Sequence, residues 1–257
     1  MHPTLSQSIR THAQRGRPGL VPYLTAGFPA KDDLLKQIRA LAPLAAAIEI
    51  GVPFSDPMAD GVTIQNSSRR ALELGVSLSW ILDQLATLRG QINTPLVLMS
   101  YLNPLLSLPG GVAALADRAA AAGLSAMIVP DLPLEESPLV RTALHKHNIG
   151  LIQMVSPVTP DARAREIAQA CDGFLYAVTV TGVTGTKATA AQAEPLNDYL
   201  DRLRAVSPVP VCAGFGIRAK SHVDALAGHA DGAIVGSALI DALARGEPAD
   251  TFLRTLI

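Results

Sequence analysis

The feature that most constrains this 257-residue chain is a regular alternation of short apolar segments with longer segments rich in Ala and Leu. The short segments have the length of strands, and the longer ones have the apolar spacing of helices. We expect strands at residues 19–25, 47–51, 95–100, 126–129, 150–154, 173–178, 209–213 and 232–235. We expect helices at residues 32–44, 77–88, 111–122, 138–147, 161–170, 195–206 and 221–227, with further helical patterns at 5–15 and 63–74. Strands that alternate with helices predict a parallel sheet.

Eight such units in about 250 residues predict a single-domain (β/α)8 TIM barrel spanning residues 1–257, with an extra N-terminal helix at 5–15. The continuous apolar strands agree with this prediction, because a parallel sheet is covered on both faces. An open, doubly wound sheet is the alternative, although it usually has fewer strands for a chain of this length.

Two of the predicted units contain more chain than a minimal barrel unit, at residues 52–75 after the second strand and 179–194 after the sixth. Both insertions follow the carboxyl end of a strand, which is where barrel enzymes carry their chemistry. Long loops at that end often form lids or binding loops. The second insertion is rich in small and hydroxyl residues, which favours a closing lid over a loose surface loop.

The composition excludes several classes of protein. Lys and Arg number 21 against 22 Asp and Glu, which argues against nucleic-acid binding and against a polybasic membrane anchor. The N-terminus has no apolar signal-peptide core and no apolar run reaches membrane-spanning length, so we expect a cytoplasmic protein. Cys171 and Cys212 form no disulfide framework and are interpreted as buried free thiols.

One carboxylate lies inside the second predicted strand, where Glu49 is flanked by Ala47, Ile48 and Ile50. Burying a carboxylate is unfavourable unless it is paired or protonated. A structural ion pair inside the barrel is one interpretation. The other, which we favour, is a general acid–base whose pKa is raised toward neutrality by burial.

A second carboxylate, Asp60, ends the first insertion just before the helical pattern at 63–74. An Asp at this place could serve only as a helix-start residue. It could equally lie above the barrel mouth as a second functional carboxylate, and the spacing does not separate the two interpretations. Asp56 precedes a proline and is interpreted from its spacing as a turn residue.

Glycine-rich loops follow the last two predicted strands, with Gly214 and Gly216 in the first loop and Gly236 and Ser237 in the second. Barrel enzymes often bind phosphate at these two loops, through backbone N–H groups and a helix N-terminus. The alternatives are ordinary turns, or a dinucleotide-type Gly-x-Gly-x-x-Ala motif, which lacks its acidic partner here. Two such loops together predict a phosphate site.

The sequence shows no pattern of metal ligands. None of its six histidines falls at the carboxyl end of a predicted strand, and it has no HExxH or CxxC motif. We therefore expect metal-free chemistry carried by carboxylates. Tyr176 in the sixth predicted strand is either a core residue or a substrate-facing hydroxyl, and Tyr101 and Asn103 are interpreted as polar rim or partner contacts.

From residue 20 to the C-terminus, the chain resembles the α subunit of tryptophan synthase. The motifs that carry this resemblance are PYLTAG at 22–27, EIGVPFSDP at 49–57, ADG at 59–61, TIQ at 63–65, PDLP at 130–133, TGVTG at 181–185 and GFGI at 214–217. The resemblance implies a lyase that cleaves indole-3-glycerol phosphate to indole and glyceraldehyde 3-phosphate by a retro-aldol reaction.

The resemblance also implies roles for individual residues. Glu49 would be the acid–base, Asp60 would pair with the indole N–H, and Tyr176 would lie near the substrate. The implied phosphate-binding residues are Gly185, Gly214, Gly216, Gly236 and Ser237. The implied walls of the indole site are Tyr23, Ile64, Met99, Ile128, Met154 and Phe215. We further predict that closure of the lid lets Thr184 hydrogen-bond Asp60.

The chain departs from the family pattern at three positions. Val62 stands where the family often has proline, and Phe28 stands where some members have an acid. Lys187 stands where arginine is frequent, and it keeps the charge but lacks the bidentate guanidinium. None of these departures alters the two carboxylates.

The family works with a β subunit that uses pyridoxal phosphate, in an α2β2 heterotetramer, and indole passes between the subunits. Phe54, Asp56, Asn103 and Pro104 match the family's contact loops, and no cofactor is expected in this chain itself. Two alternatives remain open, namely a free-standing lyase that releases indole to solution and a catalytically weak regulatory subunit. The presence of both carboxylates argues against the regulatory subunit.

Overall fold

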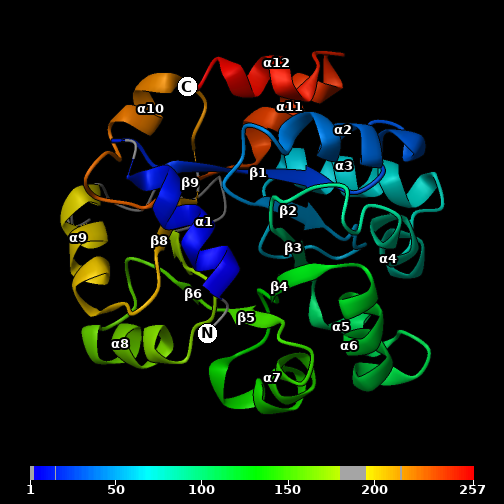
Figure 1. The fold of residues 1–257 in the computed structure, drawn as a ribbon, viewed down its shortest axis with the longest axis horizontal. Coiled ribbons are helices and arrows are strands. Elements are labelled where there is room, and N and C mark those ends of the chain that lie inside the picture. The colour runs from blue at the N-terminus through cyan, green and yellow to red at the C-terminus, as the bar shows by residue number, and fades with distance from the viewer. Residues whose placement is uncertain (1–2, 15, 180–194, 215) are drawn as a thin grey trace.

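The computed structural model describes residues 3–14, 16–179, 195–214 and 216–257, and its nine parallel strands form one sheet (Figure 1). The strands are β1 (Gly19–Thr25), β2 (Ile48–Gly51), β3 (Leu96–Met99), β4 (Leu124–Ile128), β5 (Gly150–Ile152), β6 (Met154–Val155), β7 (Leu175–Val178), β8 (Val211–Gly214) and β9 (Gly232–Val235). Their order in the sheet is β5-β4-β3-β2-β1-β9-β8-β7-β6, so β1 lies in its middle.

Along the described part of the chain, α-helices and two short 3-10 helices connect these strands and cover the outside of the barrel. They are α1 (Pro3–Ala13), η1 (Lys31–Asp33), α2 (Leu34–Leu41), α3 (Val62–Glu73), α4 (Leu78–Ala86), α5 (Leu102–Leu106), α6 (Gly111–Ala121), η2 (Leu134–Glu136), α7 (Pro138–His145), α8 (Asp161–Gln169), α9 (Leu196–Val206), α10 (Lys220–Asp224), α11 (Ser237–Ala244) and α12 (Ala249–Arg254).

The predicted fifth strand is split into β5 and β6, and this segment closes the barrel. Ile152 pairs with β4 on one side, whereas Met154 pairs with Tyr176 of β7 on the other. Between them, the N–H of Gln153 donates to the Sγ of Cys171 at 3.2 Å, which accounts for the break in the strand. The two ends of the sheet therefore meet in one continuous segment, and the predicted eight-unit barrel is confirmed.

Buried residues form two clusters, as expected for a barrel wrapped in helices. The larger cluster joins the helices to the outer faces of the strands and contains mainly Leu, Ile, Val and Ala. The smaller one lies inside the barrel and includes Val21, Val97, Ile128, Tyr176 and Ile234. Along most strands the side chains alternate between these clusters, because successive residues of a strand face opposite sides.

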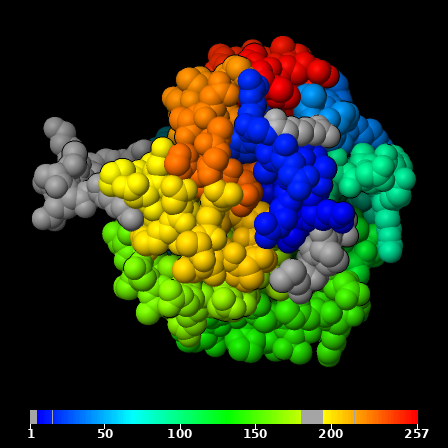
Figure 2. All heavy atoms as spheres, turned by 60° about the vertical axis from the view of Figure 1, so that its left-hand side comes forward, coloured from blue at the N-terminus to red at the C-terminus, as the bar shows by residue number. Residues whose placement is uncertain are grey.

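The extra helix α1 covers the amino-terminal end of the barrel. Its Leu5 and Ile9 are fully buried and belong to the interior cluster. The hydroxyl of Ser6 donates to the carbonyl of Gly173, which precedes β7, and the hydroxyl of Ser8 donates to the carbonyl of Ala46, which precedes β2. Figure 2 shows the outer side of these blue N-terminal residues beside the orange segment that contains α10.

Several local predictions are confirmed and others need correction. The Oγ of Ser77 accepts a hydrogen bond from the N–H of Trp80 and caps α4, as its sequence position indicates. Both cysteines are free and buried. The helices α5 and α12 were not expected, and α12 packs against α2 and α11 (Figure 1). Within the described ranges, no helix is long and apolar enough to cross a membrane.

Candidate active site

Glu49 is a buried carboxyl group on the inner face of β2. Its side chain is 1 % exposed, and the parallel register places it between Tyr23 of β1 and Val97 of β3. Burial, reinforced by the charge of Asp60, raises its pKa to about 8. Among the described residues, Oε1 of Glu49 has no hydrogen-bond partner. Glu49 also forms no ion pair within the described ranges, so the structural ion-pair interpretation finds no support there.

Asp60 precedes α3 and lies where the first insertion returns to the barrel mouth. The hydroxyl of Tyr101 donates to its Oδ2 at 3.1 Å, and Gln65 donates to its backbone carbonyl at 2.9 Å. Burial raises the pKa of Asp60, and the hydrogen bond from Tyr101 opposes that rise. Gly61, and not Asp60, is the N-cap of α3 and has no side-chain cap. The helix-start interpretation of Asp60 is therefore wrong.

Two tyrosines occupy the interior beside these carboxyls, and each lies against a glycine. A Cβ on Gly51 would come within 2.0 Å of the hydroxyl of Tyr23, and a Cβ on Gly214 would come within 2.4 Å of the ring of Tyr176. The charges of Glu49 and Asp60 add to burial in raising the pKa of both phenols. Both hydroxyls thus remain protonated and face the same space as the carboxyls.

The contact at Gly214 gives this residue a second role besides the phosphate site predicted for it. Gly214→Ala should displace the ring of Tyr176 and reduce kcat/KM for the cleavage that the sequence resemblance implies by roughly 10²-fold, the usual effect of misplacing an active-site group by about 1 Å. Gly61→Ala is the matched control, because a Cβ there meets no atom within 4 Å. Equal kinetics for the two variants would contradict this role.

Four of the six residues predicted to wall the indole site lie inside the barrel. Tyr23, Met99, Ile128 and Met154 all lie on inward-facing strand positions. Ile64 instead lies on α3, where it is half-buried and packs against the outer cluster. Phe215 lies outside the described residues, as do Thr184, Gly185 and Lys187 of the predicted lid.

The two predicted phosphate loops also lie side by side. Gly214 of β8 pairs with Ile234 of β9, so the loops after these strands begin at the same edge. Gly236 is the N-cap of α11, and Ser237 begins that helix. The first N–H groups of a helix have no partner within it and favour an anion. Gly216 adopts a left-handed φ of 76°, which few other residues tolerate.

The predicted partner contacts lie in the loop before Asp60 and in α5, two segments that meet at Tyr101. The ring of Phe54 stacks on Tyr101 with the centroids 5.1 Å apart, and Tyr101 is the N-cap of α5. Asn103 and Pro104 belong to α5, and Asn103 is exposed, as is Asp56 in the neighbouring loop. From the sequence, Tyr101 was expected to be a polar rim residue or a partner contact, and no connection with Asp60 was expected.

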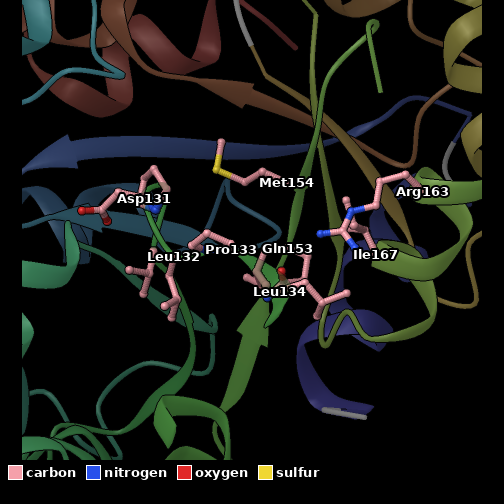
Figure 3. Close-up of a pocket in the computed structure, with 11 residues that line it drawn as sticks. Asp131, Leu132, Pro133, Leu134, Gln153, Met154, Arg163 and Ile167 are labelled. Carbon is pink, nitrogen blue, oxygen red and sulfur yellow. The ribbon is translucent and has the colours of Figure 1, made fainter. Parts of the chain in front are cut away.

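Two cavities flank the barrel mouth. The first has a volume of about 270 Å³ and lies between the loop after β4 and the segment β5–β6. Asp131 and Arg163 stand at opposite sides of it, and Met154 connects it with the interior (Figure 3). The second measures about 250 Å³ and is lined in part by Gly216 and His222, beside the predicted phosphate loops. Within the described ranges, no three His, Cys, Asp or Glu side chains are placed to hold a metal ion.

Comparisons with known proteins agree with this geometry. Residues 9–254 match the sequence model of the family described as tryptophan synthase alpha chain. The alpha chain of Chloroflexus aggregans is 45% identical, covering 91% of this chain and 87% of the relative. That of Nitratidesulfovibrio vulgaris is 41% identical, covering 97% and 96%.

Solved structures are similar as well. The α subunit from Legionella pneumophila has a TM-score of 0.84 at 30% identity, covering 98% of this chain and 96% of the other. A chain of the Pyrococcus furiosus α2β2 complex, whose subunits activate each other mutually, has a TM-score of 0.83 at 36% identity, covering 93% and 97%.

Proposed function

Since this chain belongs to the tryptophan synthase alpha chain family, we propose that Glu49 and Asp60 carry out the family's reaction inside its barrel. The protein is the α-type lyase of tryptophan biosynthesis, which cleaves indole-3-glycerol phosphate to indole and glyceraldehyde 3-phosphate. The observation that carries the residue assignment is the buried carboxyl of Glu49, whose Oε1 lacks a partner among the described residues.

Glu49 acts first as an acid and then as a base. Its raised pKa of about 8 keeps it protonated at neutral pH, so it can donate a proton to C3 of the indole ring. The resulting carboxylate then removes the proton of the glycerol hydroxyl next to the breaking bond. As the carbonyl of glyceraldehyde 3-phosphate forms, the electrons of the C–C bond return to the ring, and Glu49 ends the cycle protonated.

Asp60 stabilises the charge that develops between these two steps. Protonation at C3 makes the indole nitrogen part of a cationic iminium, and its N–H becomes a stronger donor. A carboxylate held beside that N–H stabilises the cation more than the neutral substrate, which lowers the barrier. In this scheme Glu49 starts as the neutral acid and Asp60 serves as the carboxylate, a division of roles that is frequent in active sites.

The loops after β8 and β9 bind the phosphate of the substrate. Gly236→Val should raise KM strongly, because its branched side chain would fill the space at the N-terminus of α11, where an added Cβ meets only ordinary contacts, the nearest being Tyr23 at 3.8 Å. Glycerol 3-phosphate should raise the Tm of the wild type and not that of the variant. Ser77→Ala, which removes the cap of α4 outside the barrel, is the control and should keep the ligand-induced shift. Equal shifts for wild type and Gly236→Val would place the phosphate elsewhere.

The face formed by Phe54, Asp56, Asn103 and Pro104 binds the β subunit of an α2β2 assembly. The β subunit would supply pyridoxal phosphate and consume the indole. This proposal is supported by the exposure of Asp56 and Asn103, by the half-buried Phe54 and Pro104 beside them, and by the similarity to a chain from an α2β2 complex.

The test is an assay of indole release by the purified chain, with and without the β subunit of the same organism. Release that the β subunit accelerates supports the proposal. Equal release in both conditions would favour a free-standing lyase, and no release in either would refute the catalytic assignment.

A further inference from the structure

Tyr101 contacts both ends of the loop from Phe54 to Asp60, which carries two of the proposed partner contacts and the carboxylate of Asp60. Its ring stacks on Phe54, with centroids 5.1 Å apart and planes inclined by 29°. At its other end, the hydroxyl donates to Oδ2 of Asp60 at 3.1 Å and accepts from the N–H of Ala59 at 2.9 Å. One side chain therefore joins Phe54, near the start of the loop, to Asp60 at its end.

The backbone beneath this ring is fixed by contacts that do not involve the loop. The hydroxyl of Ser100 donates to the carbonyl of Tyr101 at 2.9 Å, and Asp131 accepts from the N–H of Leu102 at 2.9 Å. Tyr101 itself is 7 % exposed, whereas Phe54 is half-buried. The tyrosine is thus anchored to β3 and α5, and the loop from Phe54 to Asp60 folds around it.

We propose that Tyr101 is a positioning residue, through which docking of the β subunit on Phe54 fixes the orientation of Asp60. This inference rests on the proposed function, because it needs Asp60 at the indole nitrogen and a partner on Phe54. A partner that holds Phe54 against the ring restricts the ring, and therefore restricts the hydroxyl that binds Oδ2. The population of molecules with Asp60 correctly placed then rises.

The chemistry of the contact suits this role. A hydroxyl that donates to a carboxylate favours its ionised form, which is the form that stabilises an iminium. It also occupies one carboxylate oxygen, and we assign the other, Oδ1, to the indole N–H. Tyr101 does not touch the reacting atoms in this scheme and acts through Asp60.

The decisive experiment is a double-mutant cycle with Tyr101→Phe and Phe54→Leu. Tyr101→Phe keeps the stacked ring and removes the hydroxyl. Indole release is measured for each chain alone and with saturating β subunit, and the affinity for the β subunit is measured by calorimetry. Tyr199→Phe is the matched control, because it also removes a buried hydroxyl, the one that donates to the carbonyl of Val155 at 3.1 Å.

Tyr101→Phe is expected to lower kcat by about tenfold to a hundredfold, as for a lost hydrogen bond to a charged group, with KM changed by less than about twofold. Its activation by the β subunit should be largely lost although the β subunit still binds. Phe54→Leu should lower activation in the wild-type background and add no further loss in the Tyr101→Phe background. Tyr199→Phe should keep the kcat and the activation of the wild type.

Additive losses in the cycle, or full activation of Tyr101→Phe, would overturn the coupling and leave the proposed function standing. A wild-type chain that releases no indole would overturn both, and a β subunit that does not bind would overturn the coupling together with the partner assignment. If Tyr101→Phe fails to fold, the effect of Phe54→Leu is measured in the wild type and in the Asp60→Asn variant. If Phe54→Leu lowers activation by the β subunit even when the Asp60 charge is absent, the coupling is refuted.

Discussion

Replacing Glu49 with glutamine is expected to reduce the cleavage of indole-3-glycerol phosphate by about 10²- to 10⁴-fold, the usual contribution of a general acid–base. Glutamine has nearly the same shape but cannot donate a proton to C3 or accept one from the glycerol hydroxyl. KM should change little, because the phosphate is bound at the loops after β8 and β9. The measurement is kcat and KM for indole release, and near-normal turnover would refute the assignment.

The stability of the same variant provides an independent control. The pKa of Glu49 is about 8 in the folded chain against an ordinary 4.5, so between these values the folded state keeps a proton that the unfolded state has lost. The wild type therefore loses stability as pH rises through this range. Glu49→Gln avoids that loss, and its free energy of unfolding should increasingly exceed that of the wild type up to about pH 8. A destabilised variant would show that its inactivity reflects misfolding.

The activity of the wild type should show the same titration. The proton donor is the neutral carboxyl, so kcat/KM should fall as pH rises through about 8. This parameter reports groups of the free enzyme, which is the state the structure describes. A rate that stays constant up to pH 10 would show that the protonated form of Glu49 is not required.

Asp60→Asn is expected to reduce kcat by roughly 10²- to 10³-fold, comparable with the loss of a group that stabilises transition-state charge. Asparagine keeps a carbonyl oxygen that can accept from Tyr101, so the loop should keep its position while the negative charge is lost. Kinetics with indole-3-glycerol phosphate and thermal unfolding are measured in parallel. A lower Tm with normal kcat would contradict the catalytic role and would leave Asp60 with a structural one.

The alternation of strands and helices was predictable because it depends on local chain properties. The strands are mostly apolar on both faces, and each helix has one apolar face, so the barrel follows from the number and spacing of the units. The break at Gln153 was not predictable, because it depends on Cys171, which is brought into contact only by the tertiary fold. Helices α5 and α12 have five and six residues, too short for a periodic pattern to be recognised.

Part of the candidate site was also predictable from the sequence. Glu49 is recognisable as a carboxylate in an apolar strand, and the glycine loops are recognisable by their position after the last strands. The sequence could not distinguish a functional Asp60 from a helix-capping Asp60, because the two roles differ in backbone geometry and not in sequence. Tyr101 lies 41 positions from Asp60, and no spacing rule links residues at that separation.

The docking of α1 under the barrel also has a consequence for how the chain folds during synthesis. Ser6 and the carbonyl it binds at Gly173 are 167 positions apart, so the N-terminal helix is made long before its binding surface exists. Contacts of such long range form late, after the costly closure of the intervening chain. Contacts that form after the folding transition state slow unfolding more than they speed folding. We therefore expect that removal of α1 mainly shortens the lifetime of the folded barrel, with a smaller effect on the rate at which it first forms.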